Sequence, residues 1–439
     1  AGWQAQQRLA LRECVAYLQR AVSLLETLPE DDPARLRSEM EAQLALGQAL
    51  TATFGWASRE LEASCLRARD LCQRLGNRAG LQQALLALSG MYFLRGSLHQ
   101  SVEVAKSVLA IAIETNDPLL QIEACHAISY PTYFLGDFPG TREYAEKGLA
   151  LYTPERERAV VATFHVPSSF ACAHILAMSL WCLGYPEEAK AAHRRSMEMI
   201  EALDLSACTA FALGCSLDYH YHWRDHATIA RKAEQVYRLS LEEGYLFWVA
   251  QTRILGGWAR AMSGDPEAGI KEMQAGLESY RVTGSGLLLP EFSLMMAEAE
   301  LRAGRLPEAL AAISQGLAQA AENDERIQEA ELHRLDGEIR LLTGDESGGE
   351  ASLLRAIEVA RGQQSKASEL RAAVALARRR GEQGRPDEAR ALVAPLVEWY
   401  RGASGIPELD EARAIVGSNG QPKRRVSAAT IKTQSVARD

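Results

Sequence analysis

The stretch Gly264-Asp265-Pro266 marks a turn that recurs through the chain at a spacing of about 40 residues, a period typical of helical repeats. Glycine fits the left-handed backbone conformation that ends a helix, and proline fits the first turn of the next helix. Each such mark therefore predicts a helix, a tight turn and a second helix. The turn glycines are Gly96, Gly136, Gly184, Gly264, Gly304, Gly344 and Gly384.

Three places depart from the plain repeat. The step from Gly136 to Gly184 is longer than the others, which indicates an insertion of eight residues. Between Gly184 and Gly264 the turn is expected at Arg224, where arginine replaces glycine although the spacing holds. The first turn is expected at Trp56, next to Gly55. Together these positions predict about nine units.

Small residues flank the turns at two fixed distances. Seven residues before the turn glycines stand Ser89, Ser129, Ala177, Gly257, Ala297, Gly337 and Ala377, and five residues after them stand Ser101, Thr141, Ala189, Gly269, Ala309, Gly349 and Ala389. Two antiparallel helices approach closely only where small side chains face each other at the crossing. The pattern is typical of tetratricopeptide-like helical hairpins, here with a unit of about 40 residues in place of the usual length of about 34 residues.

We therefore predict an all-α fold, an α-solenoid in the form of a right-handed superhelix of about nine tetratricopeptide-like hairpins. Residues 1–35 are expected to hold a helix left over from a preceding hairpin, residues 36–417 the repeat array, and residues 418–439 a disordered basic tail. The insertion falls at residues 153–165, where we expect a charged loop or a short extra turn.

Composition and charge narrow the class of protein. Hydrophobic residues make up 47% of the chain, and no run of 18 apolar residues occurs, so we expect no membrane span. Eight scattered cysteines without a Cys-x-x-Cys pair predict reduced thiols in a cytoplasmic protein. The net charge is −9 although the tail is basic, so the repeat array is more acidic than the whole chain. This charge argues against nucleic acid contact by the array.

The sequence contains no phosphate-binding loop, dinucleotide fingerprint, serine nucleophile elbow or His-Glu-x-x-His motif. We therefore expect no catalytic residue, no cofactor and no metal. His222 and His226 are four residues apart, but the turn expected between them breaks the helix face that a metal site needs, and further ligands are required. A packed structural turn is the simplest interpretation of residues 218–226, and a partner or ligand surface is the alternative.

Aromatic and histidine side chains are the candidates for partner or ligand contact, because the first helices of such hairpins line the concave face. A stripe of aromatic residues at helical spacing more often belongs to a core, which is the competing interpretation. The candidates are Tyr92, Tyr130, Tyr133, Trp181, Tyr219, His220, His222, Trp223 and Trp248.

Several longer strings resemble the C-terminal repeat region of large bacterial signalling proteins that join a class III adenylate/guanylate cyclase domain, or a regulatory domain, to an AAA-type ATPase. The resemblance covers about residues 5–417. The most specific strings are AELHRLDGEIRLL from Ala330, EVARGQQSKASELRAAVALAR from Glu358 and EARALVAPLVEWY from Glu388. The segment His165-Val166-Pro167-Ser168 departs from the family pattern.

The resemblance implies a sensor or scaffold arm downstream of an ATPase switch. The cyclase and ATPase domains have no counterpart in this sequence, so none of their residues is carried over. The first hypothesis is a non-catalytic module that binds a protein partner, or its own ATPase or cyclase domain, on the concave face. The alternative is a sensor whose small-molecule effector lies in the superhelical groove. An autonomous enzyme is disfavoured because catalytic motifs are missing.

Overall fold

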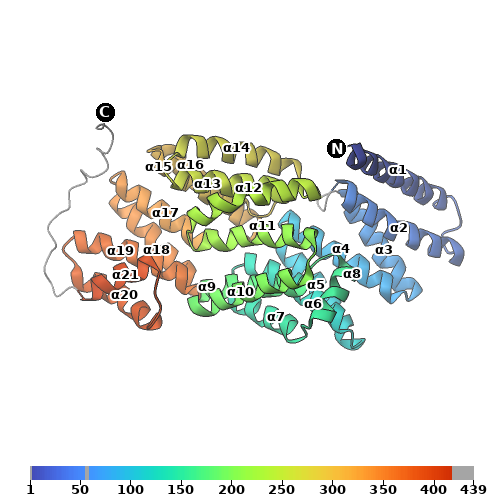
Figure 1. Ribbon diagram of the computed structural model, residues 1–439, viewed down its shortest axis with the longest axis horizontal. Helices are drawn as coiled ribbons and strands as arrows, with labels where there is room; N and C mark the ends of the chain where they lie inside the picture. Colours follow the sequence, from blue (N-terminus) through green and yellow to red (C-terminus); the bar gives the residue numbers. More distant parts are fainter. Residues whose placement is uncertain (1, 55–58, 418–439) are drawn as a thin grey trace. The chain divides into compact units, whose positions relative to one another are not determined.

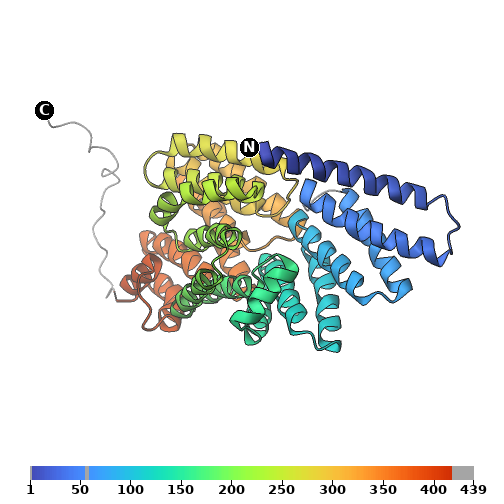
Figure 2. The same ribbon diagram turned by 45° about the vertical axis from the view of Figure 1, so that its right-hand side comes forward.

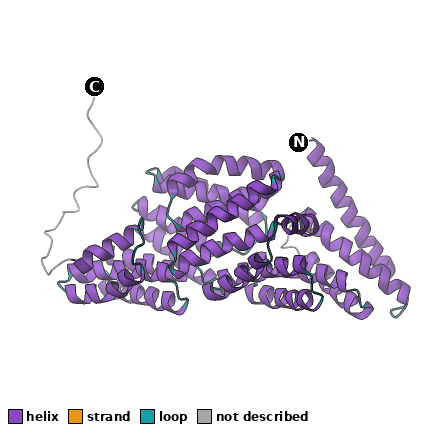
Figure 3. Cartoon of the chain, turned by 60° about the horizontal axis from the view of Figure 1, so that its bottom comes forward, coloured by secondary structure: helices purple, strands orange, loops and turns teal. Residues whose placement is uncertain are grey.

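The computed structural model describes residues 2–54 and 59–417, and every regular element within them is a helix (Figures 1 and 3). The predicted all-α solenoid of tetratricopeptide-like hairpins is confirmed. The chain divides into two compact units, of which the first ends at Ala372 and the second begins at Ala373. The predicted turn at Trp56 and the predicted tail 418–439 lie outside the described residues.

Eight hairpins follow one another among the described residues of the first unit. Their first helices are α2 (Pro33–Phe54), α4 (Arg78–Arg95), α6 (Pro118–Phe134), α9 (Ser168–Leu183), α11 (Ser206–His222), α13 (Leu246–Met262), α15 (Leu289–Arg302) and α17 (Glu329–Leu342). Their second helices are α3 (Arg59–Leu75), α5 (Leu98–Glu114), α7 (Phe138–Ala150), α10 (Pro186–Leu203), α12 (His226–Glu243), α14 (Pro266–Val282), α16 (Leu306–Asn323) and α18 (Glu346–Gly362).

The first helices lie inside and the second helices outside. Helix α9 buries every residue except Leu176. Its partner α10 buries one face only, which carries Pro186, Ala189, Ser196, Met199 and Ile200. A helix that is buried on all its faces has neighbours on every side. An enclosed site is therefore expected among the side chains of the inner helices.

The turns have the predicted backbone. Gly264 ends its helix with φ 110°, and Asp265 then accepts a hydrogen bond from the Ala268 N–H at 3.3 Å, which caps the next helix. Arg224 has φ 58°, so the arginine that replaces the turn glycine does adopt the left-handed conformation. The spacing rule therefore located a turn at which the usual residue is missing.

The predicted close crossing within each hairpin is also present. A Cβ atom added to Gly257 of α13 would lie 2.7 Å from the carbonyl oxygen of Gly269 in α14, and one added to Gly269 would lie 2.5 Å from that of Gly257. In the hairpin of α4 and α5, the hydroxyls of Ser89 and Ser101 each bond the carbonyl oxygen of the other residue. Larger side chains would push these helices apart.

The segment 153–165 forms a helix, α8 (Pro154–Phe164), so the prediction of a charged loop or a short extra turn was wrong. Thr153 accepts a hydrogen bond from the Arg156 N–H at 3.2 Å and starts the helix, and Val160 of α8 is buried. Glu157 is 1% exposed and accepts bonds from the Ser169 and Phe170 N–H groups, so α8 caps the start of α9. The charged residues that suggested a loop also carry this contact.

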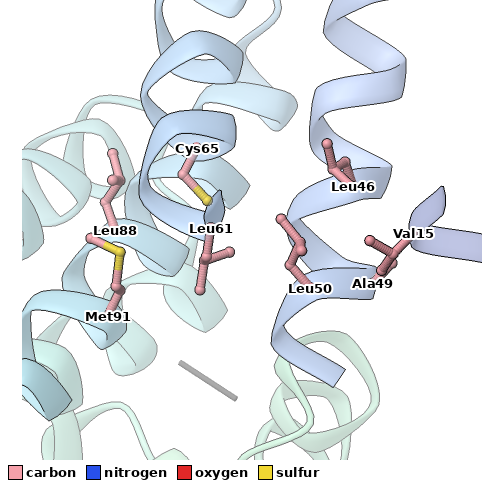
Figure 4. Packing of buried hydrophobic residues seen from close by; sticks show 8 residues of the cluster. All are labelled: Val15, Leu46, Ala49, Leu50, Leu61, Cys65, Leu88 and Met91. Atoms are coloured by element: carbon pink, nitrogen blue, oxygen red, sulfur yellow. The ribbon is translucent and has the colours of Figure 1, made fainter. Parts of the chain in front are cut away.

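The N-terminal helix α1 (Gly2–Leu25) packs against α2. Val15 of α1, Leu50 of α2, Leu61 of α3 and Met91 of α4 belong to one buried cluster of apolar side chains (Figure 4). This cluster joins the first four helices through side chains that the helical periodicity places on one face of each helix.

Hydrogen bonds also join hairpins that are far apart in sequence. The Gly286 N–H donates to the carbonyl oxygen of Leu94 at 2.9 Å, and the Arg326 N–H donates to that of Phe134 at 2.8 Å. In Figure 2 the segments before α15 and α17 can be followed, by the sequence colours, to the ends of α4 and α6. The superhelix of the first unit is therefore closed upon itself.

The second unit holds the end of α19 (Lys366–Glu382), with α20 (Pro386–Trp399) and α21 (Pro407–Gly417). Arg378 pairs with Glu411 at 2.8 Å, and Arg380 pairs with Glu388 at 2.7 Å. Helix α20 continues through Pro395, as α6 of the first unit does through Pro131.

Candidate functional site

Polar residues recur at two positions of the inner helices. Thirteen residues before the turn residue stand Gln251, Glu291 and Glu331, followed by Arg371, and six residues before it stand Asp218, Trp258, Glu298 and Glu338. Glu291, Glu298 and Glu331 are 2%, 5% and 5% exposed. We call these eight residues, together with Arg224, Glu325 and Arg334, the inner polar cluster. Buried charges need partners, so their contacts decide what the cluster does.

Neutral donors hold three of the carboxylates. Gln251 Nε2 donates to Asp218 at 2.7 Å, and Trp258 Nε1 donates to Glu298 Oε2 at 2.7 Å. The amide of Gln328, which precedes α17, donates to Glu291 Oε2 at 2.6 Å. These bonds link neighbouring inner helices through their polar side chains.

Three arginines supply the positive charge. Arg224 Nη2 lies 2.6 Å from Glu298 Oε1, and its guanidinium lies over the Trp258 ring at 5.2 Å. Arg334 donates to Glu331 Oε2 at 2.9 Å and to Glu338 at 2.6 Å. These two guanidiniums therefore have close carboxylate partners.

Arg371 contacts a backbone carbonyl as well as a carboxylate. Its Nη2 donates to the carbonyl oxygen of His222 at 2.9 Å, whereas its Nη1 is 3.8 Å from Glu331 Oε2. Its guanidinium lies 5.9 Å from the centre of the Trp181 ring. Arg371 thus connects the start of α19 to the end of α11.

A small cavity lies where these groups meet. Its walls include Trp181, Tyr221, His222, Glu331 and Arg371, and its volume of about 20 Å³ has room for about one water molecule. Within the described part of the chain, neither Glu331 Oε1 nor the Tyr221 hydroxyl has a hydrogen-bond partner. Tyr221 is 3% exposed, so both unpartnered atoms are deep inside the unit.

Equivalent carboxyls of the cluster have opposite pKa shifts. Burial, with the charge of Glu298, raises the pKa of Glu291 to about 7, although the bond from Gln328 opposes the shift. Burial also acts on Glu331, but the charges of Arg334 and Arg371 outweigh it and lower the pKa of Glu331. Proximity to arginine therefore decides which carboxyl stays ionised.

His222 is neutral at physiological pH, because burial and the charge of Arg371 lower its pKa to about 3. Its Nε2 lies 3.2 Å from the Tyr133 hydroxyl and 3.9 Å from Glu291 Oε2. Glu325 accepts bonds from the Leu288 N–H at the start of α15, and burial with the charge of Glu291 raises its pKa. The acids around Glu291 thus resist ionising together.

The structure brings four of the predicted site residues together. Trp181 and His222 line the cavity, Tyr133 contacts His222, and Trp223 packs against Trp181 with ring centres 4.1 Å apart and ring planes tilted by 36°. Tyr219 instead stacks on His193 at 3.8 Å, and His220 Nδ1 lies 3.2 Å from Asp225.

The remaining predicted residues pack elsewhere. The Tyr92 hydroxyl donates to Glu62 at 3.3 Å, Tyr130 packs against Phe93 and His126, and Trp248 covers Gly214. A binding role for these three residues stays a prediction. His226 Nδ1 lies 3.3 Å from Ser263, and within residues 2–54 and 59–417 no group of three His, Cys, Asp or Glu side chains is placed to hold a metal ion.

The charged residues of the cluster were missed, although the sequence contained a signal for them. Glu291, Glu331 and Arg371 stand one repeat length apart from one another, and so do Asp218, Trp258, Glu298 and Glu338. A search for polar and charged residues that recur at the same spacing as the turn glycines would have placed both series on the inner helices.

A second hollow lies between α7, α9 and α10, with a volume of about 320 Å³. Leu149, Leu176 and Leu180 form its apolar part, and Glu146, Glu188 and Arg195 also line it.

Among the described helices, none alone is long and apolar enough to cross a membrane. Helices α8 and α9 reach the required length and apolar content only when taken together, and they are bent by 105° relative to each other.

No family model matches this chain. The uncharacterized protein R02095 of Rhizobium meliloti (strain 1021) is 24% identical over 378 residues, which are 85% of this chain and 36% of that protein. The chain therefore spans about a third of the length of that relative.

Solved structures of helical proteins also align with the chain. A Rap protein complexed with Competence and Sporulation Factor has 11% identity over 91% of this chain and 98% of its own, with a TM-score of 0.40. A human IFIT1 dimer with PPP-AAAA has 12% identity over 88% of this chain and 87% of its own, with a TM-score of 0.44. The fold rests on the helices and contacts described above rather than on these alignments.

Proposed function

We propose that the chain is a non-catalytic protein-interaction and regulatory scaffold, the arm of a bacterial signalling protein that carries ATPase and cyclase domains. It binds a protein partner or one of those domains. The observation that carries the proposal is a series of exposed apolar side chains along one edge of the hairpin array.

These side chains lie where an outer helix gives way to the next inner helix. Val282 is 81% exposed at the end of α14, and Leu241 and Leu246 are 52% and 53% exposed on either side of the α12–α13 connection. Ile113 and Leu205 occupy corresponding places, with 62% and 44% exposure. Stacked hairpins set such positions along one edge, and an exposed apolar strip of this kind suits a protein partner.

The closed interior favours this edge over the concave face. Bonds such as that from Gly286 to Leu94 shut the superhelix of the first unit, and the inner cavity holds about one water. A partner helix needs a groove about 10 Å wide, so in this state it docks outside.

The edge is tested with the double variant Leu241→Asp/Val282→Asp. Partners captured from source cells by the full chain are identified by mass spectrometry, and the double variant is expected to lose the specific ones. The control is Leu342→Asp, which introduces an acid at a residue that is 67% exposed near the opposite end of a hairpin. Equal capture by all three proteins would contradict the proposal.

The resemblance to cyclase–ATPase proteins, and the greater length of the Rhizobium relative, support the view that the chain works within a larger molecule. An antibody against residues 36–417 is expected to detect a band well above 48.1 kDa in source cells. A band at 48.1 kDa would mean a free-standing scaffold.

The second candidate function is a sensor of a small-molecule effector. The unpartnered Glu331 Oε1 and Tyr221 hydroxyl inside one cavity favour it, because buried polar atoms without partners are rare in native proteins. A metabolite collection is screened by thermal melting of the full chain, and a true effector is expected to raise the Tm by several degrees. A screen without any shift would contradict this function.

A further inference from the structure

We propose that Lys232 is a modification site, a nucleophilic lysine that takes an acyl group from an acyl phosphate with His220 as its base. Asp225 is the positioning residue that orients the His220 ring. The three side chains meet at the turn between α11 and α12, and the proposal is independent of the partner and effector functions above. It rests on their mutual contacts, on the ion pairing of the lysines and on the charges beside Lys232.

The three side chains form a chain of contacts. His220 Nδ1 lies 3.2 Å from Asp225 Oδ2, and Lys232 Nζ lies 3.4 Å from His220 Nε2. Because the carboxylate accepts the N–H at Nδ1, the neutral ring presents its lone pair at Nε2 to the lysine. A base that lies within reach of a nucleophile and is oriented by a third group activates that nucleophile, and such contacts are often long before the reagent binds.

The backbone of the Arg224 turn holds the base and the carboxylate that orients it. The Asp225 N–H donates to the carbonyl oxygen of His220 at 2.9 Å, and Asp225 Oδ1 accepts the Thr228 N–H at 3.0 Å at the start of α12. The His220 side chain is 16% exposed, so its ring has little freedom to turn away. Lys232 follows in the second turn of α12 and is half-buried, which leaves its amine within reach of a small reagent.

Lys232 lacks the carboxylate partner that three other lysines have. A glutamate oxygen of the same helix lies 2.6, 2.9 and 2.7 Å from the amine of Lys147, Lys190 and Lys366, respectively. Among the described residues Lys232 forms no ion pair, and its ammonium group contacts His220 instead. A carboxylate beside a lysine favours the charged, unreactive form, and this restraint is missing at Lys232.

The charges around Lys232 keep both the amine and the imidazole in reactive forms. Burial, with the charge of Arg231, lowers the pKa of Lys232, although Asp225 opposes the shift. Burial and the charge of Lys232 lower the pKa of His220, and burial with the charges of His220 and Lys232 lowers that of His193 to about 4. The free amine is therefore more abundant than at an ordinary lysine, and the His220 ring is in the neutral form that accepts a proton.

A positive charge next to Lys232 favours an acyl donor that carries phosphate. Arg231 is exposed, forms no ion pair with any described residue, and donates through Nη2 to Thr228 Oγ1 at 2.9 Å. A guanidinium has five N–H donors, so several remain for the oxygens of a phosphate group. An acyl phosphate is therefore attracted to this turn by its negative charge, whereas an uncharged ester is not.

The transfer is a substitution at the acyl carbon. The free amine of Lys232 attacks this carbon, the nitrogen–carbon bond forms, and the bond from the carbon to the phosphate oxygen breaks with its electron pair on phosphate. The amine loses one proton to His220 Nε2, which passes it to the departing phosphate. The products are an N-acyl lysine and inorganic phosphate, and nothing is oxidised or reduced. The modified side chain is neutral, so the turn loses one positive charge.

The probe is acetyl phosphate, and the acetylation rate of each lysine of the full chain is measured by mass spectrometry. Lys271 of α14 is the internal reference, because it is exposed and has no ion pair within the described part of the chain. At about pH 7.5 we expect Lys232 to react about tenfold faster than Lys271. The uncharged donor p-nitrophenyl acetate is expected to give a smaller ratio. An equal or lower rate at Lys232 would overturn the proposal, and an undiminished ratio with p-nitrophenyl acetate would overturn the choice of an acyl phosphate.

The role of the base is tested with His220→Gln. This variant is expected to slow the acetylation of Lys232 about tenfold and to leave the rate at Lys271 unchanged. His226→Gln is the matched control, because His226 belongs to the same connection and its Nδ1 lies 3.3 Å from Ser263 instead. Far-UV circular dichroism establishes that both variants are folded. An unchanged rate at Lys232 in folded His220→Gln would contradict the role of the base.

The dependence of the rate on pH gives a test that needs no variant. The rate at Lys232 is expected to level off at a lower pH than the rate at Lys271, because Lys232 loses its proton more readily. Equal midpoints for the two lysines would refute the proposal.

The orientation of the ring is tested with Asp225→Asn, which keeps an oxygen for the Thr228 N–H and so retains the helix cap. The plateau rate at Lys232 is expected to fall about threefold, because the ring is held less firmly. The midpoint is expected to move to lower pH, because the carboxylate that opposes the shift of the Lys232 pKa is gone. A purely structural role of Asp225 would lower the plateau without this movement, and that result would count against the positioning role.

Discussion

Two adjacent hairpins differ in the residue that forms the turn between their helices. In the hairpin of α13 and α14, Gly264 forms the turn, and among the described residues other than its chain neighbours none has an atom within 4 Å of where its Cβ would be. In the hairpin of α11 and α12, Arg224 forms the same turn with φ 58°, and its side chain reaches Glu298. In this pair, glycine forms the turn that has only a backbone role, and arginine forms the turn from which a side chain contacts another hairpin.

The arginine turn carries a strain that its contacts offset. An L-residue in the left-handed conformation costs about 1–2 kcal/mol. Against this, Arg224 neutralises a carboxylate that is 5% exposed and whose other oxygen accepts a bond from Trp258. Loss of a partner from a buried ion pair typically costs about 3–5 kcal/mol, so the pair outweighs the strain.

The largest expected effect comes from a substitution at the close crossing of α13 and α14. Gly257→Val places a side chain against the Gly269 carbonyl oxygen and the Met273 backbone nitrogen, and we expect a loss of about 3 kcal/mol or more in the free energy of unfolding, measured by urea denaturation. The neighbouring Gly256→Ala is the control. Its added Cβ meets nothing closer than 3.4 Å, so the helix is expected to gain about 0.5–1 kcal/mol. Equal losses in both variants would refute the close crossing.

The next effect separates strain from charge at the arginine turn. Arg224→Met leaves Glu298 without its cation, and we expect a loss of about 3 kcal/mol in urea denaturation. Arg224→Gly removes the same cation but also the left-handed strain, so its loss is expected to be smaller by about 1 kcal/mol. A larger loss for glycine than for methionine would show that the turn is not strained.

The inner polar cluster is expected to make the stability of the folded chain depend on pH, whereas Gly264 has no side chain that would do so. The pKa of Glu291 is raised to about 7 in the folded chain, so the folded state binds the proton more tightly than the unfolded state. Stability from this group is therefore present at pH 5 and is lost as the pH rises through about 7. Glu291→Gln does not titrate, and its stability relative to wild type is expected to rise by about 2 kcal/mol from pH 5 to pH 8.

Other groups around Glu291 affect the same experiment in known ways. Asp218 and His222 face it from α11, and Glu325 and Gln328 face it from the segment before α17. Burial and the charge of Glu291 raise the pKa of Asp218 and of Glu325, so the substitution also changes the titration of these two acids, and the difference reports the coupled group of acids. Glu278→Gln is the surface control, because that side chain is 74% exposed, and a flat difference with pH is expected. A flat difference for Glu291→Gln as well would contradict the raised pKa.

The smallest expected effect tests the ordinary turn. The methyl group of Gly264→Ala meets no atom of the other described residues within 4 Å, apart from its chain neighbours, but the φ of 110° at this position disfavours any side chain. We expect a loss of about 1 kcal/mol by urea denaturation. An unchanged stability would mean that the turn relaxes to another backbone conformation, and the glycine spacing would then have no energetic basis.

The hairpin fold was predictable because its signals are local. A turn glycine, a following cap and two small residues at fixed offsets are all found close together in sequence, and the Arg224 turn was found from spacing alone. The closure of the superhelix was not predictable in this way. It depends on bonds such as Arg326 N–H to Phe134 carbonyl, and any residue except proline supplies the backbone donor.

The candidate site was predictable in part. Trp181 and His222 were selected as inner-helix side chains with binding chemistry, and both line the cavity. Glu331 and Arg371 were passed over, because charged residues on a helix usually face solvent. The helix α8 was missed for a related reason, since Glu157 belongs to a charged stretch but is 1% exposed.

The closing bonds also limit how this array evolves. Leu94 and Gly286 are separated by the same interval of sequence as Phe134 and Arg326, and several hairpins lie within each interval. An open solenoid gains or loses a repeat by duplication or deletion without disturbing distant repeats. Here, one unit added between these partners would shift every later hairpin past the backbone group that it bonds. The number of repeats in this interval is therefore fixed by geometry, and relatives that keep the closure are expected to vary in their loops and chain ends rather than in their repeat count.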